Sequence, residues 1–82
     1  MQKEDYLQLP YRIEYRILQV RGREYDGVVA SDYRLEAWLR EIPEVRVEAR
    51  NGGLARRWLL REFERYLDEA LQSGKDIPIP ND

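Results

Sequence analysis

The clearest signal in the chain is an alternation of apolar and polar side chains near its start. Every second residue from 11 to 17 is apolar: Tyr11, Ile13, Tyr15 and Ile17. The residues between them are arginine and glutamate, which is the period-two pattern of a β-strand with one buried face. The alternation changes phase at Leu18 and Val20, so we expect a β-bulge or a strong twist near Leu18.

The next segments are less regular. Residues 22–32 carry glycines and aspartates around a short valine run and are predicted to form a loop or a short hairpin arm. The stretch "YRLEAWLREIPEV", residues 33–45, fits two patterns, because its apolar residues have both strand and helix spacing. Pro43 ends this segment in either case, and residues 45–49 alternate again as a short strand.

A long helix is predicted in the second half of the chain. Its apolar residues recur at helical spacing and form one broad stripe: Leu59, Phe63, Tyr66, Leu67, Ala70 and Leu71. Asn51 is placed to cap its start, and Gly74 to end it in the left-handed conformation. Ile77 to Pro80 then alternates isoleucine and proline, which excludes helix. We expect this segment to be extended, packing on the end of the core or along a sheet edge.

These elements predict an α+β fold in which a three-stranded, mainly antiparallel sheet packs against one long helix, with a short extended C-terminal segment. Residues 1–10 are expected to be a flexible leader, because Pro10 discourages helix before it, and residues 11–82 a single domain. With 82 residues the core is thin. No apolar run is long enough to cross a bilayer, so we expect a cytoplasmic protein without membrane contact.

Composition disfavours catalysis. The chain has no histidine and no cysteine, which removes the usual general base, thiolate metal sites and every Ser/His or Cys/His nucleophile pair. Four carboxylates near the predicted strands were considered as a magnesium site: Asp26, Asp32, Glu36 and Glu48. Glu36 and Glu48 alternate with arginines on solvent-facing positions, so we predict no catalytic residue, no metal site and no cofactor.

The second half of the chain resembles the HicB-type antitoxin family. The resemblance lies in "IPEV" at 42–45, "RYLDEAL" at 65–71 and "SGKDIPIP" at 73–80. It implies a shrunken, catalytically silent ribonuclease H-like domain in which "YRLEAWLREIP", residues 33–43, is a strand. Glu44 stands where the family usually has glycine. Full-length members continue into a DNA-binding segment after the Ile-Pro motif, and this sequence ends at Asp82, so operator binding is not expected.

The resemblance implies a non-catalytic protein-interaction domain that neutralises a small, basic ribonuclease toxin and forms a homodimer or tetramer through its sheet edges. The residues expected to contact partners are Trp38, Arg56, Arg57, Ile77 and Ile79. Arg56 and Arg57 oppose the helix dipole, so we expect them to pair with a nearby glutamate or with a partner. Two alternatives remain open: a small nucleic-acid-binding module, which the net charge of −2 disfavours, and an orphan HicB-like assembly or regulatory protein without a toxin.

Overall fold

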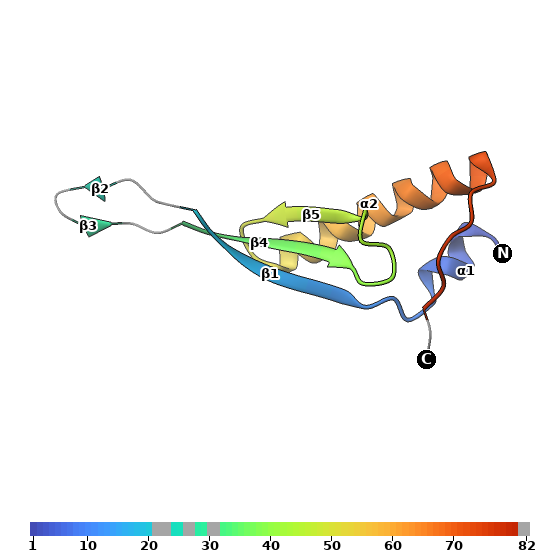
Figure 1. The fold of residues 1–82 in the computed structure, drawn as a ribbon, viewed down its shortest axis with the longest axis horizontal. Coiled ribbons are helices and arrows are strands. Elements are labelled where there is room, and N and C mark those ends of the chain that lie inside the picture. The colour runs from blue at the N-terminus through green and yellow to red at the C-terminus, as the bar shows by residue number, and fades with distance from the viewer. Residues whose placement is uncertain (21–23, 26–27, 30–31, 81–82) are drawn as a thin grey trace.

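The computed structural model describes residues 1–20, 24–25, 28–29 and 32–80, and it has the predicted α+β fold (Figure 1). Strands β1 (Ile13–Val20), β4 (Asp32–Leu39) and β5 (Arg46–Ala49) form an antiparallel sheet in the order β1-β4-β5. The two-residue strands β2 (Glu24–Tyr25) and β3 (Val28–Val29) pair at the far end of the β1–β4 hairpin. The long helix α2 (Gly52–Ser73) lies on one face of the larger sheet, and the short helix α1 (Lys3–Leu7) precedes β1.

Of the two expectations near Leu18, a bulge or a strong twist, the bulge is wrong. The pairing of β1 with β4 runs without interruption from Ile13 opposite Leu39 to Val20 opposite Asp32. The hydrophobic alternation changes phase for a different reason: Ile17 lies on the helix-facing side of the sheet but is 68% exposed. Where no element covers the strand, burial does not dictate which side chains must be apolar. The segment 33–39, which local pattern left open, is a strand.

Helix α2 begins and ends at the residues that the sequence indicates. The Asn51 side chain accepts a hydrogen bond of 2.9 Å from the Leu54 amide, which satisfies one of the free donors at the helix start. Gly74 has a φ of 71° and donates its amide to Ala70, a conformation that costs a residue with a Cβ more than glycine.

The core lies between α2 and the two strands β4 and β5. The buried apolar residues come from every part of this layer pair: Ala37, Leu39, Ile42, Val45, Ala49, Ala55, Leu59, Phe63, Leu67, Ala70 and Ile77. None of them belongs to β1. Within the described ranges, no helix is both long enough and apolar enough to cross a membrane.

The N-terminal residues, expected to be a flexible leader, contain helix α1, which packs against α2. Tyr6 and Leu7 contact the core, and the Lys3 ammonium lies 3.2 Å from the Asp68 carboxylate on α2. The Gln2 amide donates to the Asp5 side chain at 2.7 Å, so the start of this short helix is capped. The proline argument restricted only the residue before Pro10, and a single turn of helix fits ahead of it.

The C-terminal segment packs on the end of the core and does not form an edge strand. Ile77 is buried, and the Tyr11 hydroxyl donates a hydrogen bond of 2.6 Å to the Pro78 carbonyl. The Tyr11 ring in turn meets Phe63 of α2 edge-on, with ring centroids 4.8 Å apart. Tyr11 thus links the start of β1, the middle of α2 and the C-terminal segment.

We predict that Tyr11→Phe lowers the free energy of unfolding by about 1 kcal/mol, because the Pro78 carbonyl loses its donor. Burial, followed by the charges of Tyr6 and Glu41, raises the pKa of Tyr11 to about 12. Its contribution is therefore complete below the unfolded pKa of about 10 and is lost as the pH rises through about 12. Urea unfolding at neutral and alkaline pH measures both effects.

The control for this variant is Tyr15→Phe, since Tyr15 is 46% exposed and its hydroxyl has no hydrogen bond within the described part of the chain. The variant lacking the Tyr11 hydroxyl should lose less stability than the wild type between neutral pH and pH 11. If the Tyr11→Phe variant and the wild type lost the same free energy of unfolding at alkaline pH, the role given to Tyr11 would be contradicted.

Candidate functional site

The helix-facing side of β1 is open beyond Ile13. Helix α2 packs mainly on β4 and β5, and Ile13, at the N-terminal end of β1, packs against the core. Tyr15 and Ile17 point to this side, where they are 46% and 68% exposed. On α2, Trp58 lies toward β5, next to Val47, so Leu60, two positions on and half-exposed, projects to the opposite side, toward β1. Tyr15, Ile17 and Leu60 form what we call the open apolar strip, a surface of the kind that marks protein contacts.

The other side of the sheet carries a network of charges around Glu36. The Glu36 carboxylate is nearly buried and lies 3.0 Å from the Arg16 guanidinium and 3.9 Å from that of Arg46. Arg46 also covers the Trp38 ring at 5.9 Å, a cation–π arrangement. Glu14, directly opposite Trp38 in the register, pairs with Arg40 at 3.6 Å. The tryptophan predicted to contact a partner is therefore half-buried within this network.

Helix α2 carries its charges in the order that opposes its dipole. Arg56 and Arg57 are exposed near the positive N-terminus, where no acidic residue occupies the first turn, and Asp68 and Glu69 lie toward the negative C-terminus. The expected pairing of Arg56 or Arg57 with a glutamate does not occur among the described residues, whose helix-surface pairs join Arg65 to Glu62 and Glu69.

Arg56, two positions before Trp58, projects to the opposite side of α2, whereas Trp58 and Arg61 lie on the side toward β5. Together with Arg46, Val47 and Glu48 of β5, and with Glu62, they line an open hollow of about 480 Å³. Trp58 is 41% exposed. An exposed tryptophan with several arginines around it suits a peptide or a nucleic acid, because both can stack on the ring and bind the guanidinium groups.

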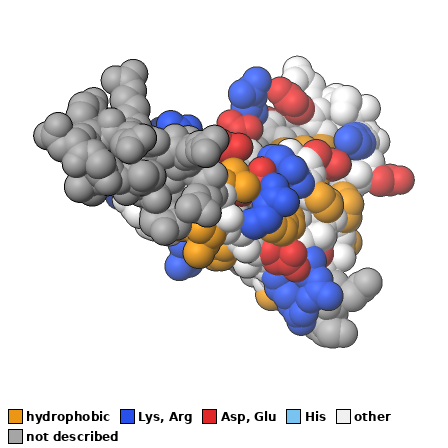
Figure 2. Space-filling model, turned by 60° about the vertical axis from the view of Figure 1, so that its left-hand side comes forward, with side chains coloured by type: hydrophobic (Ala, Val, Ile, Leu, Met, Phe, Trp, Pro, Cys, Tyr) orange, Lys and Arg blue, Asp and Glu red, His pale blue; other side chains and the backbone are white. Residues whose placement is uncertain are grey.

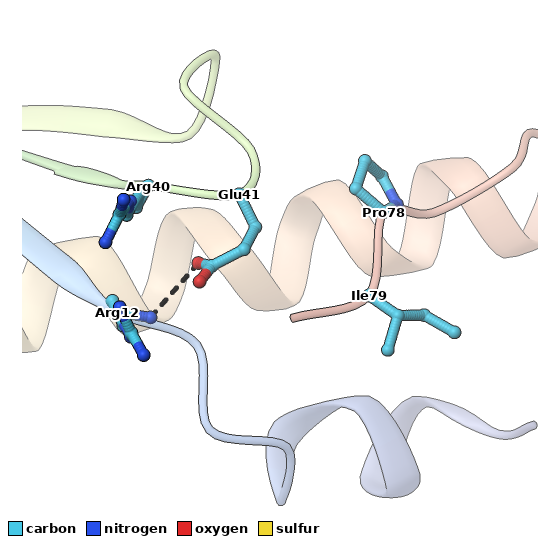
Figure 3. Close-up of a pocket in the computed structure, with 5 residues that line it drawn as sticks. All are labelled: Arg12, Arg40, Glu41, Pro78 and Ile79. Carbon is cyan, nitrogen blue, oxygen red and sulfur yellow. Dashed lines mark hydrogen bonds between the residues drawn. The ribbon is translucent and has the colours of Figure 1, made fainter. Parts of the chain in front are cut away.

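The two C-terminal isoleucines have different environments. Ile77 is part of the core and is not available to a partner, whereas Ile79 is 53% exposed. Figure 3 shows Ile79 and Pro78 facing Arg12, Arg40 and Glu41 across an open hollow of about 390 Å³. The Arg12 amide donates to the Glu41 carboxylate at 3.1 Å, which ties the start of β1 to the residues after β4.

Of the four carboxylates that are candidates for a metal site, the structure describes the side chains of Glu36 and Glu48 only. Glu36 and Glu48 are direct neighbours across β4 and β5, but Glu36 is held by two arginines. Asp26 lies outside the described residues. In the part of the chain that the structure describes, no three acidic side chains are grouped so that they could hold a metal ion.

The face of the molecule in Figure 2 has a mixed character. On the face shown in Figure 2, hydrophobic side chains lie among basic and acidic ones. The sequence analysis identified Trp38, Arg56, Arg57 and Ile79 as surface residues but assigned Tyr15 and Ile17 to a buried face. The open apolar strip could have been predicted from the number of strands per helix. One helix is about 10 Å wide and strands are spaced roughly 4.8 Å apart, so one helix covers only about two strands.

We predict that Glu36→Gln lowers the free energy of unfolding by about 1–2 kcal/mol, because the nearly buried charge that holds Arg16 and Arg46 is removed and the two guanidinium groups then repel each other. Glu14→Gln is the matched control: its pair with Arg40 is longer and more exposed, so the loss should stay below about 0.5 kcal/mol. Chemical denaturation of both variants measures the difference, and equal losses would contradict a central role for Glu36.

A second variant tests the charge order of α2. Arg57→Glu should raise the free energy of unfolding by about 0.5 kcal/mol, because it removes a cation near the helix start and replaces the Arg57–Arg61 repulsion by an attraction. Arg57→Gln, which removes the charge without reversing it, should give about half of that gain. A loss of stability in both variants would mean that Arg57 makes a stabilising contact within the fold.

Comparisons of the chain with known proteins gave no matches. No protein-family model matches it, no curated protein matches it significantly, and neither does any solved structure. The resemblance to HicB-type antitoxins therefore stays a prediction from the sequence. The function has to be argued from the surfaces described above.

Proposed function

We propose that this chain is a non-catalytic protein-interaction domain. The observation that carries the proposal is the open apolar strip: Tyr15 and Ile17 stand on a sheet face that the domain's own long helix does not cover. Leaving such side chains in water forfeits the free energy that burial would give, about 25 cal/mol for each Å² of apolar surface. A second polypeptide that covers the strip recovers that free energy.

The chemistry of the remaining surface supports the same role. The two hollows described above are lined by arginine, glutamate and apolar side chains, which recognise peptide groups and carboxylates. Tryptophan and arginine, the residues that dominate the energetics of many interfaces, lie together at Trp38 and Arg46.

The narrower proposal is an antitoxin of the HicB type whose partner is a small, basic ribonuclease toxin. Two facts support it: the motifs at 42–45, 65–71 and 73–80, and the fold, in which residues 33–39 of the implied 33–43 strand belong to β4, which ends at Leu39. In this proposal Trp38, with the charge network beside it, contacts the toxin. Self-association through a sheet edge forms the second part of the same role.

One alternative has an observation of its own. Arg46 and Arg61 line the same hollow as the exposed Trp58, an arrangement that suits single-stranded nucleic acid. Binding of this kind weakens steeply as salt rises, because counterions are released from the phosphates. Binding to a toxin through Trp38 and apolar contacts should resist salt.

The test is to co-express the tagged chain with a small basic protein encoded beside it and to recover the complex at high salt. Trp38→Ala should lower the recovered partner about ten-fold, as expected for a central interface tryptophan, while Trp58→Ala should leave it unchanged. Circular dichroism confirms that both variants are folded. Recovery of nucleic acid alone, released by moderate salt and lost with Trp58→Ala, would replace the antitoxin proposal by the nucleic-acid module.

A further inference from the structure

We propose that two copies of this chain pair through the free edges of their β1 strands, antiparallel and centred on Tyr15. The inference deepens the proposed interaction role by naming its partner at the open apolar strip as a second copy of the chain. Within the described residues, β1 pairs only with β4 and stands at the edge of the sheet. In Figure 1 it runs along the margin of the molecule, with the sheet on one side only.

The hydrogen-bond pattern selects which residues present their backbone groups to this edge. The Arg40 amide donates to the Arg12 carbonyl at 2.9 Å, so Arg12 and the even-numbered residues of β1 direct their backbone groups at β4. Ile13, Tyr15 and Ile17 therefore direct theirs outward. A second strand docked there pairs odd-numbered residues with odd-numbered residues.

Only a few registers satisfy that condition, and charge distinguishes them. Centring the pair on Glu14 places Glu14 opposite its own copy, and centring it on Arg16 does the same for Arg16. Like charges directly opposite each other destabilise a sheet. Centring the pair on Tyr15 places Glu14 opposite Arg16 of the second copy, twice by symmetry, at the closely spaced non-hydrogen-bonded positions.

The remaining registers bury less or are blocked. A pair centred on Ile17 sets Arg16 against Leu18 and forms no charge pair. A pair centred on Ile13 sets Arg12 against Glu14 of the second copy, but it also sets residues 14–20 of one copy against residues 6–12 of the other, where α1 ends and the hydrogen bond from Tyr11 to Pro78 holds the C-terminal segment. The register centred on Tyr15 sets only residues 18–20 against residues 10–12. The register centred on Tyr15 keeps residues 13–17 of both copies inside β1 and forms about six backbone hydrogen bonds.

This register extends the charge network across the contact. Within one copy Arg16 already pairs with Glu36, and Glu14 with Arg40. Joining Glu14 to Arg16 of the second copy gives a row whose signs alternate from Arg40 through Glu14 to Arg16 and Glu36 of that copy. Ion pairs that share partners in a network stabilise more than isolated surface pairs do.

The same register covers apolar surface on the helix-facing side. Ile13 comes to lie opposite Ile17 of the second copy, and the two Tyr15 side chains meet at the two-fold axis. Both α2 helices then stand on one face of a continuous six-stranded sheet and flank the joined strips, with each Leu60 directed toward the axis. Charge complementarity and apolar burial thus favour one arrangement.

Cysteine scanning tests the register directly, because the chain has no cysteine of its own. In the proposed dimer the two Tyr15 Cα atoms lie about 5.5 Å apart, within disulfide reach, whereas positions 14 and 16 are separated by roughly 8 Å from their own copies and position 17 by more. Under mild oxidation, Tyr15→Cys should crosslink about ten-fold faster than Glu14→Cys, Arg16→Cys or Ile17→Cys.

A charge swap provides the second measurement. Glu14→Arg and Arg16→Glu should each weaken dimerisation about ten-fold in sedimentation equilibrium, while an equimolar mixture of the two should form a heterodimer, because every opposed pair is then Arg–Glu. A wild type that is monomeric up to about 1 mM, equal crosslinking at all four positions, or fastest crosslinking at 14, 16 or 17 would overturn the proposal.

These experiments need no toxin, so their outcome is separate from that of the Trp38→Ala capture test. A dimer without toxin capture would retain this inference and overturn the antitoxin proposal. A monomer that captures the small basic protein through Trp38 would retain the antitoxin proposal and overturn the β1 pairing.

Discussion

The structure depends on one geometric constraint: a single helix packs against a sheet of three strands. The apolar stripe of α2 packs against β4 and β5, which supply the buried sheet residues of the core. A stripe one helix wide covers about two strands. The third strand is held by its hydrogen bonds to β4 and by contacts at its N-terminal end, where Tyr11 meets Phe63. The domain therefore folds with Tyr15 and Ile17, on the helix-facing side of β1, exposed to solvent.

In this arrangement, most residues that stabilise the fold differ from the residues that we assign to partner contacts. The residues that hold the fold lie on α2, on β4 and β5, and on the C-terminal segment anchored by Ile77. The residues that we assign to partners lie at the edge strand and on the outer sheet face. A substitution at Tyr15 or Ile17 therefore removes little of the core, and evolution of the contact surface is only weakly constrained by folding.

The charges on the sheet serve both the fold and the proposed contacts, whereas those at the start of α2 do not serve the fold. Glu36 is held by two arginines and joins β1, β4 and β5 through their side chains. The arginines at the start of α2 work against the helix dipole and take no part in the ion pairs among the described residues. The first set fits a structural role, while the second costs a little stability, so a role outside the folded chain is the simpler explanation for it.

Local sequence pattern was enough to place the first strand, predicted from Tyr11 and observed from Ile13, the cap at Asn51, the apolar stripe of α2, the left-handed Gly74 and the extended Ile-Pro segment. These follow from local physics, namely side-chain period, capping and backbone sterics. Contacts between segments distant in the sequence determine the rest. Residues 33–39 are a strand because β1 and β5 pair with them, residues 3–7 are a helix that packs on α2, and Tyr15 and Ile17 stay exposed because, among the described residues, the one long helix covers two strands.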